Sequence, residues 1–140
     1  MEIKNKVIVV TGGAGGIGLA IAKEFLNHNP KIIILADISF ENINYINEKI
    51  INKKCDISNE TQINSLIDKV NKEFGLIDIF CSNAGILTLG DEQSSNEDWS
   101  KNWNLHVMAH VYAAKKLIPD MVNRGSGYFV NTSSLEHYEF

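Results

Sequence analysis

The chain has 140 residues, of which 44% are hydrophobic and 21% are charged, and its formal net charge is −4 at pH 7. This length and composition are typical of a globular protein, so we expect residues 1–140 to form a single domain with its own core. The mildly acidic balance and the lack of a basic cluster argue against binding to nucleic acid or to an anionic membrane. No apolar run reaches the length of a membrane span or of a signal peptide, which favours a cytoplasmic location.

Apolar runs and helical stripes alternate along the chain. We expect strands at residues 6–11, 31–36, 50–55, 77–82 and 128–133, helices at 16–28, 40–49, from Ser58 or Thr61 to 74, and at 96–123, and a polar loop at 87–96. Asn29 and Pro30 should end the first helix, and Gly75 the third. Strands that are nearly continuous apolar runs indicate a parallel sheet covered on both faces. Right-handed crossovers then give an α/β, Rossmann-type doubly wound fold with strand order 3-2-1-4-5.

A glycine-rich segment joins the first expected strand to the first expected helix, and it reads Thr11-Gly12-Gly13-Ala14-Gly15-Gly16-Ile17-Gly18. Glycines let the backbone turn tightly and approach a ligand without a Cβ in the way. The helix that follows points its free N–H groups and its positive dipole end at a negative charge. The segment therefore predicts a pyrophosphate site for a dinucleotide, formed by Gly12, Gly16, Ile17 and Gly18.

An acidic residue stands at the expected distance from this segment. Asp37 lies 19 residues after Gly18, at the end of the second apolar run. A carboxylate there accepts hydrogen bonds from both hydroxyls of the adenosine ribose and repels a 2′-phosphate. No arginine lies near Asp37 in the sequence, and the glycine turn holds no Lys or Arg, so we expect the cofactor to be NAD. Asp37 could also serve only as a helix cap or turn residue before Ser39.

The cysteines and two of the histidines have simpler interpretations. Cys55 and Cys81 lie in or beside expected strands without a C-x-x-C spacing, which predicts buried structural thiols. His106 and His110 are four residues apart on an expected helix, but no third ligand stands out. We therefore expect no metal site.

Several further motifs follow the glycine segment in a fixed order: Cys55-Asp56-Ile57, Asn83-Ala84-Gly85, Asn104-Leu105, and Phe129-Val130-Asn131-Thr132-Ser133-Ser134. From about Lys6 to Ser134 the chain resembles the short-chain dehydrogenase/reductase family, whose glycine pattern matches Gly12, Gly16 and Gly18. The resemblance implies that Asp56 contacts the adenine amino group, beside Ile57, and that Asn83, Ala84 and Gly85 hold the sheet and the cofactor ribose. It also implies that Asn104 and Ser134 are catalytic.

The same resemblance implies an enzyme that transfers hydride between NAD and a small alcohol or carbonyl substrate. In that family a tyrosine, followed by a lysine four residues later, completes the site downstream of the serine, and this chain ends at Phe140. Tyr112 and Lys116 have that spacing but precede the serine, so we interpret them as surface residues of a helix. We therefore expect the cofactor-binding half of the family fold, with negligible activity by itself. The alternatives are a non-catalytic NAD-binding module and an inactive truncated product.

The long helix expected at 96–123 carries an apolar stripe formed by Trp103, Val107, Val111 and Ala114. The family often forms dimers through this helix, so the resemblance implies a homo-oligomer as one explanation of the stripe, and packing against the core explains it equally well. The identity of the substrate does not follow from the sequence.

Overall fold

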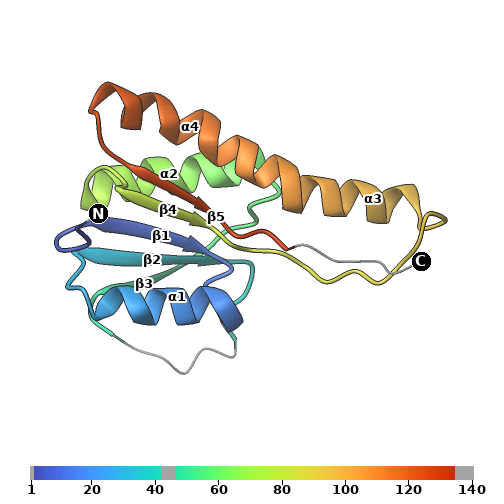
Figure 1. The fold of residues 1–140 in the computed structure, drawn as a ribbon, viewed down its shortest axis with the longest axis horizontal. Coiled ribbons are helices and arrows are strands. Elements are labelled where there is room, and N and C mark those ends of the chain that lie inside the picture. Colours follow the sequence, from blue (N-terminus) through green and yellow to red (C-terminus); the bar gives the residue numbers. More distant parts are fainter. Residues whose placement is uncertain (1, 42–46, 135–140) are drawn as a thin grey trace.

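The computed structural model of the protein describes residues 2–41 and 47–134, which form one parallel sheet with helices on both faces (Figure 1). The five strands lie in the order β3-β2-β1-β4-β5, as predicted. The strands are β1 (Val7–Thr11), β2 (Ile32–Asp37), β3 (Ile50–Lys54), β4 (Ile79–Ser82) and β5 (Tyr128–Asn131). The helices are α1 (Gly16–Leu26), α2 (Glu60–Phe74), α3 (Asn96–Trp103), the π-helical turn η1 (Asn104–Met108) and α4 (Ala109–Asn123).

The central strands are buried on both faces, which explains their continuous apolar sequences. Every residue of β1 is buried, and β1 pairs with β2 on one side and with β4 on the other. Alternate side chains point to opposite faces, so β1 contributes Ile8 and Val10 to the core under α1, and Val7 and Val9 to the core under α2 and α4. Figure 1 shows α1 alone on one side of the sheet and the other helices on the opposite side.

The helix expected at 96–123 is interrupted. It begins at Asn96 and ends at Asn123, but the turn Asn104–Met108 is π-helical and separates α3 from α4. The core face of this helical segment is also a different row of residues from the expected stripe. Ala109, Ala113, Leu117 and Met121 are buried instead, whereas Trp103 is 59% exposed and Val111 is 38% exposed. The stripe therefore lies outside the core.

The start of α2 was predicted wrongly and its end correctly. The cap of α2 is Asn59, whose side chain accepts the N–H of Gln62, and not Ser58 or Thr61. Asn59 directly precedes Glu60, the first residue of α2, whereas Ser58 lies one residue earlier and donates its hydroxyl to the Asp56 carboxylate. Gly75 ends α2 as predicted, with a φ of +98°.

Residues 40, 41 and 47–49 are not helical, so the helix expected at 40–49 is wrong at both its ends, and its centre lies outside the described residues. The first helix ends at Leu26, three residues before Asn29, which takes a positive φ before Pro30. Both cysteines are buried and free, as predicted. Within residues 2–41 and 47–134, no helix has the length and apolar character needed to cross a bilayer.

Candidate functional site

A cavity of about 410 Å³ lies at the ends of the strands, where the chain leaves β1, β2 and β4 toward opposite faces of the sheet. Parallel doubly wound sheets bind their ligands at this switch point. The cavity gathers side chains and backbone from both halves of the sequence: Gly12, Ala36, Asp37, Ile38, Cys55, Asp56, Ile57, Ser58, Ala84, Gly85, Ile86, Lys101, Asn104 and Leu105. Seven of the expected site residues are therefore brought together here, namely Gly12, Asp37, Asp56, Ile57, Ala84, Gly85 and Asn104.

The glycine segment packs too closely for side chains at two of its positions. Gly12 has a φ of +66°, and a Cβ on it would lie 2.8 Å from the Cα of Ala84. A Cβ on Gly18 would lie 2.2 Å from the carbonyl oxygen of Gly12. Only glycine fits these contacts, which draw the start of α1, the end of β1 and the segment after β4 into one compact turn.

The first turn of α1 differs from those of α2 and α3. The side chains of Asn59 and Ser95 cap α2 and α3, and each of those helices has an acidic residue in its first turn. The cap residue of α1 is Gly15, which offers no side-chain hydrogen bond, and the first turn of α1 holds no acid. The N–H groups at the start of α1, which include those of Gly16, Ile17 and Gly18, therefore keep their capacity to bind an anion.

Asp37 connects the end of β2 to the glycine segment. One carboxylate oxygen accepts the Ala14 N–H at 3.0 Å, and the other accepts the N–H groups of Ile38 at 2.7 Å and Ser39 at 3.4 Å. The turn role considered for Asp37 is therefore present in the structure. A carboxylate has about four acceptor positions, so these three contacts leave room for about one hydroxyl donor from a ligand, or for two where the long contact to Ser39 gives way.

Asp56 and Cys55 form the wall of the cavity at the end of β3. The Asp56 carboxylate accepts hydrogen bonds from the backbone N–H and the hydroxyl of Ser58, at 2.9 and 2.7 Å. Burial, with a smaller contribution from the Asp56 carboxylate, raises the pKa of the Cys55 thiol to about 11. The thiol is therefore protonated at neutral pH and acts as a small apolar group.

A buried hydroxyl fastens β1 to the segment after β4. Thr11 is fully buried, and its hydroxyl accepts the N–H groups of Asn83 at 2.9 Å and Ala84 at 3.1 Å and donates to the carbonyl of Cys81 at 3.3 Å. The amide of Asn83 donates to the carbonyl of Thr11 and accepts the hydroxyl of Thr132, just beyond β5. Asn83 thus ties three strand ends together. The sequence carries one signal for this role of Thr11, which is a polar residue closing an otherwise apolar strand.

A second cavity, of about 670 Å³, adjoins the first and shares Ala84 and Gly85 with it. It is lined by Asn83, Ala84, Gly85, His106, Val107, His110, Val111, Asn131, Thr132, Ser133 and Ser134. The structure thus places Ser134 in the second cavity and Asn104 in the first. Gly16, Ile17 and Gly18 line neither cavity, and Ile17 is 65% exposed.

The two histidines of the long helix have separate partners. The Nε2 atom of His106 lies 3.1 Å from the carbonyl oxygen of Ile86, and the Nδ1 atom of His110 lies 3.0 Å from the side-chain oxygen of Asn131. In the part of the chain that the structure describes, no group of three His, Cys, Asp or Glu side chains could hold a metal ion. The contact of His106 is one that sequence reasoning missed, because we had considered this residue only as a metal ligand.

Tyr112 and Lys116 occupy the outer layer of α4. Lys116 pairs with Asp68 of α2 at 2.8 Å, and Tyr112 packs against the core under α2 and α4. Both side chains therefore have structural partners away from the two cavities, in agreement with the interpretation of this pair as helix surface residues.

Comparison with known proteins identifies the family. The model of the short chain dehydrogenase family matches residues 6–138. The chain is 32% identical to a 3alpha-hydroxysteroid dehydrogenase of Mediterraneibacter gnavus, and the match covers 96% of this chain and 58% of that protein. It is 33% identical to a protein of Yarrowia lipolytica named "Probable NADP-dependent mannitol dehydrogenase", over 96% of this chain and 51% of that protein.

Solved structures agree with these relatives. A short chain dehydrogenase/reductase from Burkholderia phymatum, in complex with NAD, superposes with a TM-score of 0.86 at 26% identity and covers 96% of this chain and 50% of that one. The ligand-free aldohexose dehydrogenase of Thermoplasma acidophilum gives a TM-score of 0.83 at 32% identity, over 94% of this chain and 50% of that one. The chain thus spans about half the length of the proteins it matches.

The family match over nearly all of the chain, the strand order and the glycine turn at the switch point agree with one another. The chain belongs to the short-chain dehydrogenase/reductase family of oxidoreductases, whose members bind a nicotinamide cofactor.

Proposed function

We propose that this chain binds NAD, with the pyrophosphate at the start of α1 and the adenosine half in the cavity that Asp37 lines. The observation that carries this proposal is the uncapped first turn of α1 beside the Asp37 carboxylate. The two features fit the two halves of one ligand, because the helix end favours the negative pyrophosphate and the carboxylate favours ribose hydroxyls. Asp56 and Ile57 would lie against the adenine, and Asn83, Ala84 and Gly85 against the other ribose.

NADP is the competing cofactor, and two lysines give it a specific argument. Lys54 is the register partner of Asp37 on the neighbouring strand, and Lys101 lines the same cavity. Either ammonium could attract a 2′-phosphate. We favour NAD because the carboxylate of Asp37 lies at the end of β2 itself, where a 2′-phosphate would stand beside a like charge.

Titration calorimetry with NAD and NADP tests this assignment. We expect the chain to bind NAD more tightly than NADP, and the Asp37→Ala variant to lose about tenfold in NAD affinity, since each good hydrogen bond to a charged group contributes about 1.5–3 kcal/mol. Asp68→Ala is the matched control, because Asp68 lies on α2, pairs with Lys116 of α4 and lines neither cavity. Tighter binding of NADP, or no binding of NAD at millimolar concentration, would contradict the proposal.

The proposed reaction is hydride transfer between NAD and a small alcohol or carbonyl compound held in the second cavity. Ser134 would donate its hydroxyl proton in a hydrogen bond to the substrate oxygen, which polarises a carbonyl group. Asn104, which begins η1 and lines the first cavity, would contribute to this reaction from the helix side of the site. A screen of secondary alcohols for NADH formation tests the reaction, and where turnover is found we expect Ser134→Ala to lower kcat at least tenfold. Unchanged kcat in that variant would remove Ser134 from the mechanism.

Self-association through α3 and α4 is the partner interaction that this chain favours. Trp103 is 59% exposed at the end of α3, off the buried face formed by Ala109, Ala113 and Leu117, whereas Val111 lines the second cavity. A large exposed aromatic side chain favours pairing with a second copy of the same helix.

A further inference from the structure

The imidazole of His106 lies against the backbone at the point where the two cavities meet. Its Nε2 atom is 3.1 Å from the carbonyl oxygen of Ile86 and 3.5 Å from the backbone nitrogen of the same residue. A Cβ added to Gly85 would lie 2.9 Å from Cε1 of His106, so the ring also covers Gly85. His106 is the middle residue of the π-helical turn η1, the one irregular turn between α3 and α4. The turn and the contact therefore occur at the same residue.

The segment that His106 touches has few other supports. After β4 the hydroxyl of Thr11 holds the N–H groups of Asn83 and Ala84. From Gly85 to Gly90 the contact between Ile86 and His106 is the one hydrogen bond that the structure gives to a described residue. Ala84 and Gly85 line both cavities, and Ile86 lines the first. The wall between the cavities is thus fastened at one end by Thr11 and at the other by His106.

We propose that His106 is a positioning residue, which fixes the Gly85–Ile86 backbone as the wall of the dinucleotide site. This inference rests on the proposed binding of NAD in the first cavity. It concerns a different residue from Asn104, which lines the first cavity itself. The imidazole of His106 does not need to touch the cofactor. It acts through the Gly85–Ile86 backbone, which lines the cofactor cavity.

The two distances also indicate whether Nε2 of His106 donates or accepts the hydrogen bond. A single Nε2 atom either donates a proton or accepts one, so it cannot satisfy both the carbonyl and the N–H of Ile86. The shorter distance is to the carbonyl oxygen, which favours the Nε2–H form as donor. A glutamine side chain places an amide at about the same reach from the backbone, with one donor and one acceptor. His106→Gln should therefore replace the contact, and His106→Ala should remove it.

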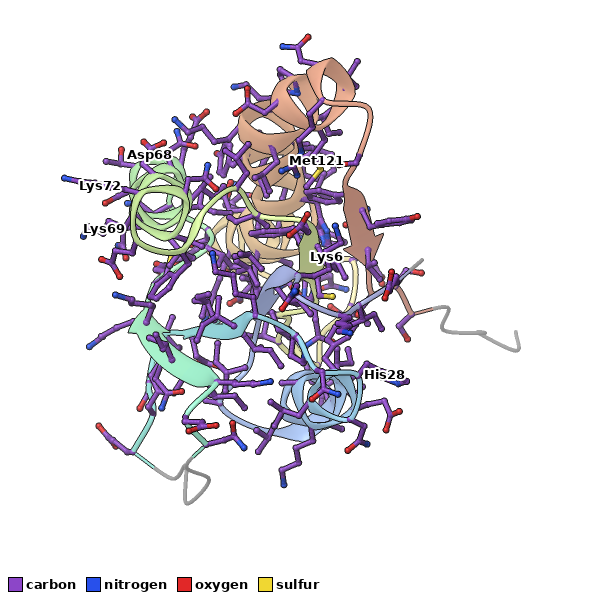
Figure 2. All side chains as sticks on the ribbon, turned by 90° about the vertical axis from the view of Figure 1, so that its left-hand side faces the viewer. Lys6, His28, Asp68, Lys69, Lys72 and Met121 are labelled. Carbon is purple, nitrogen blue, oxygen red and sulfur yellow. The ribbon has the colours of Figure 1, made fainter. Side chains whose placement is uncertain are left out.

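The test compares His106→Ala and His106→Gln with the unchanged 140-residue chain. The matched control is His28→Ala, because His28 lies in the turn just after α1, at the end of the sheet where the strands begin and away from both cavities (Figure 2). NAD affinity is measured by calorimetry, hydrogen exchange is followed in peptides that cover residues 84–90, and the urea midpoint reports global stability. We expect His106→Ala to weaken NAD binding about tenfold and to accelerate exchange in residues 84–90, where the N–H of Ala84 is bound to Thr11 and the N–H of Ile86 faces the imidazole, with the urea midpoint nearly unchanged.

His106→Gln should recover at least a third of the NAD affinity and the slow exchange, and His28→Ala should match the unchanged chain. The proposal is overturned if His106→Ala exchanges and binds like the unchanged chain, or if His106→Gln loses as much as His106→Ala. The exchange measurement needs no ligand. If the unchanged chain does not bind NAD, the proposed function fails, whereas exchange in residues 84–90 still decides whether His106 fastens this backbone.

Discussion

Replacing Gly18 with alanine adds one methyl group at the closest backbone approach in the glycine turn. The new Cβ would lie 2.2 Å from the carbonyl oxygen of Gly12, 2.8 Å from its carbonyl carbon and 2.9 Å from Nδ2 of Asn83. The first two atoms are backbone and the third is held by hydrogen bonds, so the start of α1 must move away by about 1 Å to restore ordinary contact. Such overpacking costs about 1–3 kcal/mol.

Alanine also favours the helix by up to about 1 kcal/mol relative to glycine, so we expect a net loss of about 1–2 kcal/mol in the free energy of unfolding. In urea this lowers the midpoint by on the order of 1 M, and NAD affinity should fall as well because the phosphate-facing turn is displaced. Gly15→Ser is the control, because a Cβ on Gly15 meets nothing within 4 Å. Serine is also a good helix cap, so this larger side chain should not lower the midpoint. A Gly18→Ala variant that unfolds at the same urea concentration as the unchanged chain would refute the packing argument.

Three other outcomes follow from the structure. Thr11→Val leaves the N–H groups of Asn83 and Ala84 without their buried acceptor and should lower the free energy of unfolding by about 2–3 kcal/mol in urea titrations; an unchanged midpoint would show that water replaces the hydroxyl. Burial raises the pKa of Cys81 from 9.0 to about 11, so the folded state keeps a proton that the unfolded chain releases. Stability should therefore fall from pH 9 to pH 11, with a smaller fall in Cys81→Ala. Equal slopes in the two proteins would contradict this. Trp103, which is 59% exposed, should stabilise a dimer in sedimentation velocity, and Trp103→Glu should shift it toward the monomer; a chain that is monomeric at all concentrations would exclude the pairing.

The strand order and the position of the site follow from local sequence patterns. Five apolar runs separated by helical stripes permit few arrangements once crossovers are right-handed, and a glycine turn after the first run marks the switch point. The helix boundaries were harder to predict, because several neighbouring residues can each serve as the cap of one helix. Ser58, Asn59 and Thr61 can all cap a helix, and Asn59 does so because the helical turn begins at Glu60, which places its side chain next to the N–H of Gln62.

In the candidate site, too, sequence patterns predicted some features and tertiary packing decided others. Motif spacing predicted that Asp37, Asp56, Ala84 and Gly85 would meet, and the cavity at the sheet edge gathers them. Spacing could not separate Asn104 from Ser134, which line different cavities, because one lies at the start of η1 and the other beyond β5, and only packing sets how these two segments are placed. The residue pattern at 96–123 predicts one continuous helix and gives no sign of the π-helical turn at Asn104–Met108.

The sequence by itself determined the fold class, the strand order and the family, because each depends on periodicity, glycine placement and the order of short motifs along the chain. Only the tertiary structure decided that Thr11 and His106 fasten the wall between the two cavities. It also decided that the stripe containing Trp103 and Val111 lies outside the core. These outcomes depend on contacts between residues up to 73 positions apart, as between Thr11 and Ala84. Such contacts form only when the strands and helices pack, so no local pattern encodes them.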